Sequence, residues 1–438
     1  MPTLTFKGGV HPYDGKDLTK DKKIIDLLPQ GELVYPLSQH IGAPANPIVA
    51  VGDRVLAGQK IAEANGFVSS PIYSSVSGTV KAIEKRRVVT GDMSMAIVIE
   101  NDDLYDEAPK LHSMTIDQMT QADVINIIKE AGIVGMGGAG FPTHVKLSPK
   151  DPDKIHFVIA NCAECEPYLT SDYRRMMEEP EKLVAGLKII LGLFPHAKGI
   201  LGIEDNKQDA ARKLKDLVID EPRIEVKVLK TKYPQGSERQ LIFATTRHAI
   251  NSTMLPADAG CIVNNVDTIV AIYHAVIEGR PLTERIITVT GDAVKYPQNY
   301  RVRTGTCYED LIEAAGGFRS EPEKIISGGP MMGFALFDLH VPVTKSSSAI
   351  TAFLKDPVSE NKPSACINCG MCVSACPAGL MPCRLAKAAA NGAEDTFLKL
   401  NGMECVECGC CSYICPAKRH VTQSIKTMRR GIMAKKRK

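Results

Sequence analysis

Apolar residues recur at two different periods along the chain, and the change of period divides it into segments. From residue 34 to residue 100, Val and Ile alternate with polar residues and are interrupted by turn pairs at Gly52-Asp53, Asn65-Gly66 and Ser77-Gly78. Such alternation is typical of β-hairpins and predicts a small β-sandwich. The first 30 residues are polar and rich in turn residues, and we expect them to wrap over the rest of the chain.

From residue 115 to residue 280 the pattern alternates between helical spacing and short β-branched runs. Helical spacing predicts helices over 116–132, 172–194, 206–218 and 265–279. The β-branched runs predict strands over 154–161, 197–205 and 223–230. Alternation of this kind is typical of an α/β domain with a largely parallel sheet.

The fold class predicted for the whole chain is therefore a multidomain protein that combines β and α/β parts. The expected division is an N-terminal wrap and β domain over 1–110, an α/β domain over 111–281, a small β–helix–β module over 282–345, a polar linker over 346–365, a cysteine-rich domain over 366–420 and a basic tail over 421–438. From residue 417 onward the chain carries nine Lys and Arg and no acidic residue. Two interpretations of the tail stay open, a solvated disordered end or a segment attracted to anionic lipid or to membrane subunits.

Composition narrows the compartment and the partners. The 438 residues carry a net charge of +3 and no Trp, which gives no argument for nucleic acid. No apolar run approaches the roughly 18–20 residues that span a bilayer, and the first residues lack the apolar core of a signal peptide. We therefore expect a protein on the cytoplasmic side, whose 14 cysteines are reduced thiols or metal ligands.

Ten of those cysteines follow residue 365, and eight of them form two copies of C-x₂-C-x₂-C-x₃-C-P. In this spacing three thiolates bind one 4Fe–4S cluster and the fourth binds the other cluster. The predicted ligand sets are Cys366, Cys369, Cys372 and Cys415 for one cluster, and Cys376, Cys405, Cys408 and Cys411 for the other. Zinc is the alternative, but a zinc site does not need the third cysteine or the Cys-Pro ending. Cys383 and Cys410 lie outside the pattern and are expected to be packing residues.

A second candidate site is the glycine-rich stretch GIVGMGGAGFPTHVKL, residues 132–147. It contains G-x-G-x-x-G, but a Rossmann loop follows a strand and opens a helix, whereas this loop follows a helical segment and runs directly into Phe141-Pro142. The glycine density suggests close backbone approach to a flat or phosphate-bearing ligand. Phe141 offers an aromatic face and Lys146 a cation.

Polar residues after two predicted strands extend this candidate site. Asn161, Glu164 and Glu166 lie at or beyond the end of one strand, and Asn264-Asn265 directly precedes a helix. Ligands of open α/β sheets bind at that edge, and amides at a helix start can hold a phosphate or a flavin ring. Cys162 and Cys165 form a C-x-x-C beside the site, for which wall packing is favoured over a redox disulfide or a metal.

Together GMGGAGFPTHVK, NCAECEP and NNVDT resemble the flavoprotein subunit of respiratory complex I. The order of parts, from the FKGGVHP start to the cysteine-rich end, resembles the RnfC family, whose members are subunits of Rnf, a membrane-bound ferredoxin:NAD⁺ oxidoreductase complex. The resemblance implies a lipoyl-like N-terminal domain, an FMN/NADH domain, a β-grasp ligand-binding-like module and a two-cluster ferredoxin domain. The expected tip of the lipoyl-like domain, Asn65-Gly66-Phe67, has no lysine to modify, so we expect a structural or docking role.

The resemblance also implies site residues. The FMN site would comprise Gly135, Gly137, Gly138, Gly140, Lys146, Asn161, Glu164, Asn264, Asn265 and Thr268. NADH would stack near Phe141, with Glu166 and Glu238 at its polar edge. The chain departs from complex I at Met136, where arginine is usual, and at Ala163 and Cys165, where Asp and Ser occur. His144 is expected to be a wall or surface residue rather than a proton donor.

The expected FMN/NADH domain and the expected two-cluster domain together imply a function. NADH delivers a hydride to FMN, and the two 4Fe–4S clusters relay single electrons onward or in reverse. The chain would be the peripheral NAD(H)-interacting subunit of an Rnf membrane complex, with ferredoxin and Na⁺ or H⁺ transport reached through its other subunits. The alternatives are a soluble cobalamin reductase of the propanediol-utilisation type, and a non-catalytic iron–sulfur carrier without flavin.

Overall fold

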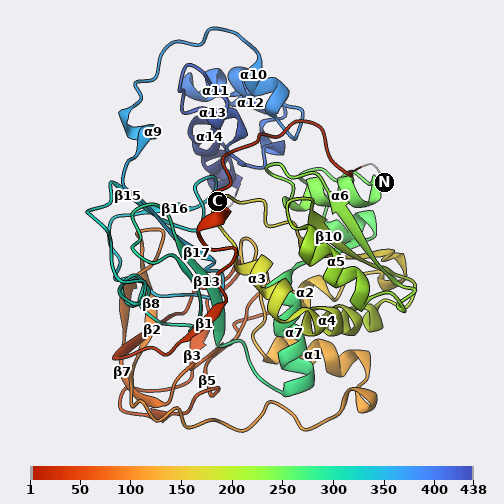
Figure 1. Ribbon diagram of the computed structural model, residues 1–438, viewed down its shortest axis with the longest axis vertical. Helices are drawn as coiled ribbons and strands as arrows, with labels where there is room; N and C mark the ends of the chain where they lie inside the picture. Colours follow the sequence, from red (N-terminus) through yellow and green to blue (C-terminus); the bar gives the residue numbers. More distant parts are fainter. Residues whose placement is uncertain (1–2, 437–438) are drawn as a thin grey trace.

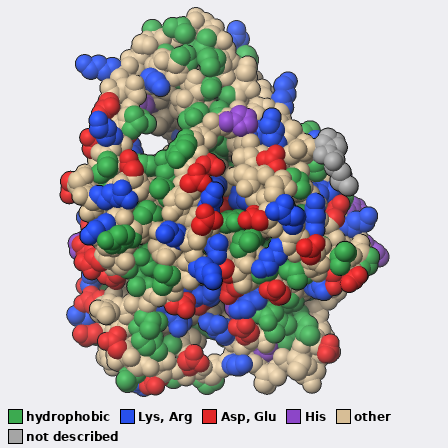
Figure 2. Space-filling model, in the orientation of Figure 1, with side chains coloured by type: hydrophobic (Ala, Val, Ile, Leu, Met, Phe, Trp, Pro, Cys, Tyr) green, Lys and Arg blue, Asp and Glu red, His purple; other side chains and the backbone are tan. Residues whose placement is uncertain are grey.

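The computed structural model describes residues 3–436 and arranges them in four parts (Figure 1). Within these residues no helix combines the length and the apolar character that crossing a membrane requires. On the face shown in Figure 2, acidic and basic side chains are interspersed over most of the surface.

The N-terminal β domain consists of two small sheets that share one core. The first sheet has the strand order β2-β8-β7-β4 and the second β3-β5-β6. Leu33, Tyr35, Ile61 and Ile97 are fully buried between them, which is the sandwich that the alternating pattern predicted. The strands are β2 (Glu32–Pro36), β3 (Asn46–Pro47), β4 (Arg54–Val55), β5 (Lys60–Glu63), β6 (Ile72–Tyr73), β7 (Gly78–Arg87) and β8 (Met93–Asn101).

The central domain is an α/β layer structure with a four-stranded, fully parallel sheet of order β11-β10-β9-β12. The strands are β9 (Phe157–Cys162), β10 (Lys198–Glu204), β11 (Ile224–Leu229) and β12 (Cys261–Asn265). The helices are α1 (Gln121–Glu130), α2 (Thr143–Lys146), α3 (Ser171–Glu178), α4 (Pro180–Leu193), α5 (Gln208–Leu217), α6 (Glu238–Thr246) and α7 (Val266–Glu278). The alternation predicted from the sequence is confirmed.

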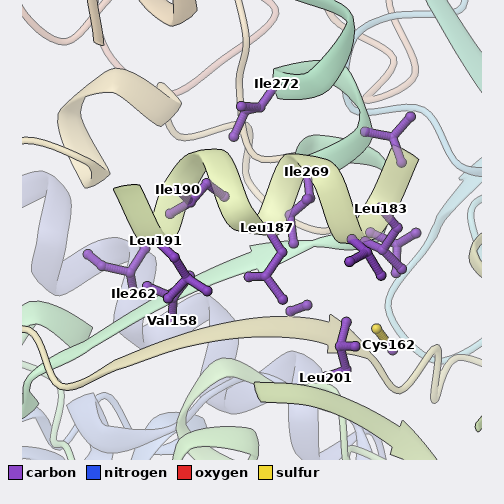
Figure 3. Close-up of a cluster of buried hydrophobic side chains, with 14 of the residues drawn as sticks. Val158, Cys162, Leu183, Leu187, Ile190, Leu191, Leu201, Ile262, Ile269 and Ile272 are labelled. Carbon is purple, nitrogen blue, oxygen red and sulfur yellow. The ribbon is translucent and has the colours of Figure 1, made fainter. Parts of the chain in front are cut away.

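The core of this domain lies between the sheet and helices α4 and α7 (Figure 3). Leu183, Leu187 and Ile190 follow the i, i+4, i+7 spacing of one face of α4 and pack with Ile269 of α7 and Val158 of β9. Because this layer fixes β9, β12 and the start of α7, it also fixes the polar residues at their carboxyl ends.

The third part is a six-stranded sheet of order β1-β14-β13-β17-β15-β16, with helix α8 (Tyr308–Ala314). Its strands are β1 (Ile24–Leu27), β13 (Glu284–Thr290), β14 (Gln298–Arg303), β15 (Lys324–Ser327), β16 (Phe334–Leu336) and β17 (Ala349–Phe353). Two of them fall outside the expected module. Strand β1 comes from the N-terminal wrap and pairs with β14, and β17 comes from the expected linker and pairs with β13 and β15.

The cysteine-rich domain is helical and lies at the top of Figure 1. Its helices are α10 (Met371–Ala375), α11 (Pro382–Ala390), α12 (Glu394–Lys399), α13 (Cys410–Tyr413) and α14 (Val421–Lys436), and α9 (Pro357–Glu360) lies in the segment before it. The short 3₁₀ turns of the chain are Lys16–Leu18, Ile116–Gln118, Pro152–Lys154, Pro256–Ala259 and Gly402–Glu404.

The interpretation of the tail as a disordered end is wrong for residues 421–436. They form α14, which packs on α11 and buries Val421, Ile425 and Ile432 in the core of the cysteine-rich domain. These three residues have helical spacing, and burying their apolar surface is enough to order a helix that is otherwise basic. Residues 437 and 438 lie outside the described part of the chain.

Candidate functional site

The glycine-rich stretch forms a tight hairpin between α1 and α2, which we call the glycine hairpin (residues 133–143). Gly135 N donates to Phe141 O over 2.8 Å, and Thr143 N donates to Ile133 O over 3.0 Å. The loop therefore joins two helices and folds back on itself, unlike a strand–loop–helix dinucleotide fingerprint. The prediction that it is no Rossmann loop is confirmed.

The tip of this hairpin is open on one side and closely packed on the other. A Cβ on Gly138 would meet no protein atom within 4 Å, whereas one on Gly137 would lie 3.1 Å from Asn265 Cβ. Gly140 has φ +69°, and a Cβ there would lie 3.1 Å from Gln39 O in the N-terminal domain. The hairpin is thus wedged between two domains and leaves a bare backbone surface at Gly138.

The start of α7 holds the hairpin from behind. Met136 N donates to Thr268 Oγ1 over 3.0 Å. Asn265 caps α7, accepting from Asp267 N over 2.9 Å, and donates to Asp172 Oδ2 over 2.7 Å. The two predicted ligands Thr268 and Asn265 therefore form hydrogen bonds within the protein. These hydrogen bonds hold the glycine hairpin in position.

Two other predicted ligands have polar groups that the protein leaves unsatisfied or poorly solvated. Asn264 is buried, and neither its amide nitrogen nor its oxygen has a hydrogen-bond partner within residues 3–436. Lys146 Nζ donates to Val263 O over 3.2 Å and lies 3.5 Å from the position of a Cβ on Gly135. Burial lowers the pKa of Lys146, and nearby Glu238 opposes this. Burial raises the pKa of Glu238, which Lys146 opposes in turn.

These observations meet the requirements of a bound flavin nucleotide. An unpartnered buried amide costs free energy unless a ligand supplies its hydrogen bonds. A half-buried ammonium beside a bare glycine backbone suits a phosphate or an electron-rich ring. The predicted site residues therefore gather near Asn264, at the carboxyl end of β12. They are Gly135, Gly137, Lys146, Asn265, Thr268 and Glu238.

The acidic loop after β9 faces other parts of the molecule. Glu164 has φ +47°, and its Oε1 accepts from Asp172 N over 2.8 Å at the start of α3. Its Oε2 lies 3.5 Å from Lys16 Nζ. Asn161 donates to Gly236 O over 2.8 Å. Both predicted ligands thus shape the loops around the site.

Glu166 ties this loop to the six-stranded module. Its Oε1 accepts from Met331 N over 2.6 Å and from Met332 N over 3.2 Å. Burial raises the pKa of Glu166 to about 7, although these two bonds favour the carboxylate. The carboxyl group expected at the edge of NADH is therefore engaged with a neighbouring domain.

Sequence reasoning missed two residues here, buried Lys16 and half-buried Asp172. Lys16, from the polar N-terminal wrap, is buried and donates to Glu166 O over 3.1 Å. Burial, Glu164 and Asp267 raise the pKa of Asp172 to about 8. Neither residue lies in a recognisable motif, and a polar wrap and a helix start usually face solvent. The C-x-x-C thiols Cys162 and Cys165 are both free, and Cys165 Sγ accepts from Gly236 N over 3.2 Å.

The cysteine-rich domain brings one predicted ligand set together around a small apolar cavity. The four cysteines of the set, Cys376, Cys405, Cys408 and Cys411, all line this cavity, and so does Cys410, which lies outside the ligand pattern. Burial raises the pKa of Cys411 to about 12, and the nearby Cys408, Cys405 and Cys376 thiols add to this shift. Four cysteines around one cavity is the donor set of a 4Fe–4S cluster.

The other set lies toward the outside. Cys366 and Cys369 are exposed, and Cys372 and Cys415 are half-buried. Burial raises the pKa of Cys372 to about 11, with the Cys383 and Cys366 thiols nearby. Within residues 3–436, no three Cys, His, Asp or Glu side chains converge as closely as a single metal ion requires.

Tyr233 lies where the central α/β domain meets the cysteine-rich domain. Burial raises its pKa, and Glu166, Cys165 and Cys408 act in the same direction because they are close. Its hydroxyl has no hydrogen-bond partner in the described part of the chain. Cys410, outside the ligand pattern, is buried with its Sγ 3.8 Å from Tyr233 O. One end of the cysteine-rich domain therefore packs against the loop that borders the glycine hairpin's domain.

Comparison with protein families assigns each part. Residues 128–274 match the Nuo51 FMN-binding domain and residues 365–418 the 4Fe–4S dicluster domain. Residues 4–104 match the RnfC barrel sandwich hybrid domain and residues 286–335 the SLBB domain. Fold and site thus define an electron-transfer flavoprotein with an FMN domain and a two-cluster iron–sulfur domain.

Comparison with individual proteins narrows the class. The chain is 46% identical over 435 residues to the RnfC protein of the Na⁺-translocating ferredoxin:NAD⁺ oxidoreductase complex of Acetobacterium woodii, covering 99% of this chain and 98% of that protein. It is 46% identical to the RnfC protein of the proton-translocating complex of Clostridium ljungdahlii, over 87% of this chain and 84% of that protein. The chain belongs to the RnfC family of Rnf-type ion-translocating oxidoreductase complexes.

More distant relatives agree in fold. The RnfC protein of the ion-translocating oxidoreductase complex of Vibrio cholerae is 37% identical over 87% of this chain, which spans about half (49%) of that longer protein. Among solved structures, an air-oxidized NAD⁺-reducing [NiFe]-hydrogenase is similar with a TM-score of 0.51 and 20% identity, over 70% of this chain and 63% of that one.

Proposed function

We propose that the chain is the NAD(H)-interacting subunit of an Rnf-type complex, passing electrons between NAD(H), FMN and two 4Fe–4S clusters. In the complex this transfer is coupled to ferredoxin and to Na⁺ or H⁺ transport, and the partners are the other Rnf subunits. The chain binds peripherally, at the cytoplasmic face of the membrane. The observation that carries the proposal is the glycine hairpin, with unpartnered Asn264 and half-buried Lys146, in one chain with two C-x₂-C-x₂-C-x₃-C-P runs.

FMN, when bound, accepts two electrons as a hydride and releases them singly. The residues proposed to hold it are Gly135, Gly137, Gly138, Gly140, Lys146, Asn161, Glu164, Asn264, Asn265 and Thr268. The glycines admit the ligand close to the backbone, Lys146 compensates negative charge, and Asn264 gains the hydrogen bonds that the protein does not give it. Thr268 and Asn265 act by holding the hairpin in place.

For NAD(H) the proposed residues are Phe141, Glu166 and Glu238. Glu238 is supported by its proximity to Lys146. Glu166 acts through the backbone of Met331, which it orients, and a carboxyl group of pKa about 7 exchanges its proton readily near neutral pH.

The proposed cluster sets are those given by the spacing. Cys376, Cys405, Cys408 and Cys411 form the set nearer the FMN domain, since Cys408 packs with Tyr233. Cys366, Cys369, Cys372 and Cys415 form the outer set, whose exposed Cys366 and Cys369 are accessible to a partner protein of the complex. Electrons would then pass from FMN to the inner set and from the inner set to the outer set.

The test is anaerobic purification of the full chain with reconstituted clusters, followed by addition of NADH. The expected result is about one FMN per chain and NADH-dependent bleaching of the cluster absorbance. Absence of stoichiometric flavin together with no bleaching by NADH would leave an iron–sulfur carrier in its place. Reduction of cobalamin by the isolated chain, without co-purifying membrane subunits, would favour a cobalamin reductase.

A further inference from the structure

The FKGGVHP start of the chain runs between the FMN domain and the cysteine-rich domain (Figure 1, the red segment below the blue domain). We call residues 6–10 the N-terminal strap. Before the strap, Leu4 N donates to Val228 O over 3.1 Å, which adds a short bridge to the edge of the parallel sheet beside β11. At its end, Val10 N donates to Tyr233 O over 2.8 Å and Tyr233 N donates to Val10 O over 2.9 Å. One side of the strap is therefore part of the FMN domain.

The other side of the strap contacts the cysteine-rich domain. Gly9 N donates to Ala375 O over 2.9 Å, at the end of α10. A Cβ on Gly8 would lie 2.8 Å from Cys376 O, and a Cβ on Gly9 would lie 2.7 Å from Tyr233 O. Both glycines also have φ near +85°, a conformation that other residues rarely adopt. Only two adjacent glycines let the strap pass between the two domains in this conformation.

Lys232 fastens the strap from the FMN domain. Its side chain is buried, and its Nζ donates to Phe6 O over 2.5 Å and to Gly8 O over 2.8 Å. The same ammonium lies 3.9 Å from the centre of the Phe6 ring. Within residues 3–436 it forms no ion pair. The buried Lys232 ammonium thus contacts two carbonyl groups and one aromatic ring of the strap. These contacts hold the strap against the central domain.

Side chains of the two domains also contact each other directly. Arg239 pairs with Glu404 over 3.1 Å, and Glu404 accepts from Ser252 N over 2.8 Å. The covalent connection, residues 357–366, is exposed throughout. The strap also shares the interior of the interface: Val10 lies in one buried cluster with Tyr233 of the central domain and with Ala375, Cys408 and Cys410 of the cysteine-rich domain.

We propose that the N-terminal strap is a clamp that sets the position of the inner cysteine set against the FMN domain, with Gly8, Gly9 and Lys232 as positioning residues. It takes no part in hydride transfer and controls the passage of electrons between the flavin and the cluster of Cys376, Cys405, Cys408 and Cys411. This inference rests on the proposed function for its redox readout, and on the interface alone for its structural readout.

The experiment compares Gly9→Ala and Lys232→Met with wild type in the full chain. Flavin reduction is measured as NADH oxidation with ferricyanide, which takes electrons from reduced flavin, and cluster reduction is followed by rapid-freeze EPR. Amide hydrogen exchange of residues 405–411 reports docking without any turnover. Gly52→Ala is the matched control, because Gly52 has φ +96° and open space around it.

In Gly9→Ala, the new side chain lies in the left-handed region and clashes with a carbonyl oxygen. We expect this strain to lower the ratio of docked to undocked cysteine-rich domain by about tenfold. We expect unchanged ferricyanide activity, cluster reduction slowed by about tenfold and faster exchange at residues 405–411 in Gly9→Ala and Lys232→Met, with none of these effects in Gly52→Ala. Wild-type cluster reduction and wild-type exchange in both variants would overturn the clamp. Loss of NADH oxidation in wild type itself would instead refute the proposed function, and the exchange measurement would still test the strap.

Discussion

Gly138 allows the flavin site to be tested without disturbing the fold. A Cβ at this position would meet no protein atom within 4 Å, and its backbone is not in the left-handed region. Leucine should therefore be accommodated in the chain as a surface substitution, with a change of at most about 0.5 kcal/mol in the free energy of unfolding. The neighbouring glycines do not offer this test, because Gly137 and Gly140 pack against Asn265 and Gln39 O.

If FMN lies on the glycine hairpin, the same leucine occupies space that the ligand needs. Overpacking of this kind costs about 1–3 kcal/mol, which raises the Kd for FMN by about 5- to 150-fold. NADH oxidation should fall in proportion to the lost flavin. Both clusters should assemble normally, because all eight cysteines lie in another domain.

The assay measures FMN per chain by fluorescence after release, iron per chain, and NADH oxidation with ferricyanide. Gly192→Leu is the control, since Gly192 lies in α4 and also has open space around it. The reasoning is refuted if Gly138→Leu retains wild-type FMN content and wild-type NADH oxidation. It is equally refuted if iron and flavin are lost together, because the substitution would then act on the fold.

Two further predictions concern the cysteines and a buried lysine. Cys408→Ala should remove about half of the iron and leave FMN bound, whereas Cys383→Ala should keep all of the iron; equal iron in the two variants would contradict the ligand assignment. Lys345 donates its ammonium protons to Ser70 Oγ, Pro71 O and Gly132 O, and burial lowers its pKa from 10.5 to about 7. At a pH between these two pKa values, Lys345 is protonated in the unfolded chain and neutral in the folded chain. The free energy of unfolding of wild type should therefore rise relative to that of Lys345→Met, by up to roughly 1.4 kcal/mol per pH unit above pH 7. Urea unfolding at pH 7, 8 and 9 measures this slope, and parallel pH profiles would contradict it.

Local spacing was sufficient for much of the fold and for the chemistry it implies. The two C-x₂-C-x₂-C-x₃-C-P runs predict their ligand sets, because in each run three thiolates can bind one cluster and the fourth can bind the other. The helical and β periods of residues 115–280 predicted the parallel sheet, since each element buries one face of its own. In α14, Val421, Ile425 and Ile432 also follow helical spacing, but the positive charge of the segment is equally typical of a solvated tail.

Contacts between residues far apart in sequence were decided only by the tertiary structure. Lys232 and Gly8 are 224 positions apart, and Lys16 and Glu166 are 150 apart, so no local pattern marks these pairs. The glycines of FKGGVHP are visible in the sequence, but the reason for them is the carbonyl groups of Tyr233 and Cys376 on either side. A sequence records which groups are available for chemistry, whereas their burial and separation depend on how the domains close around them.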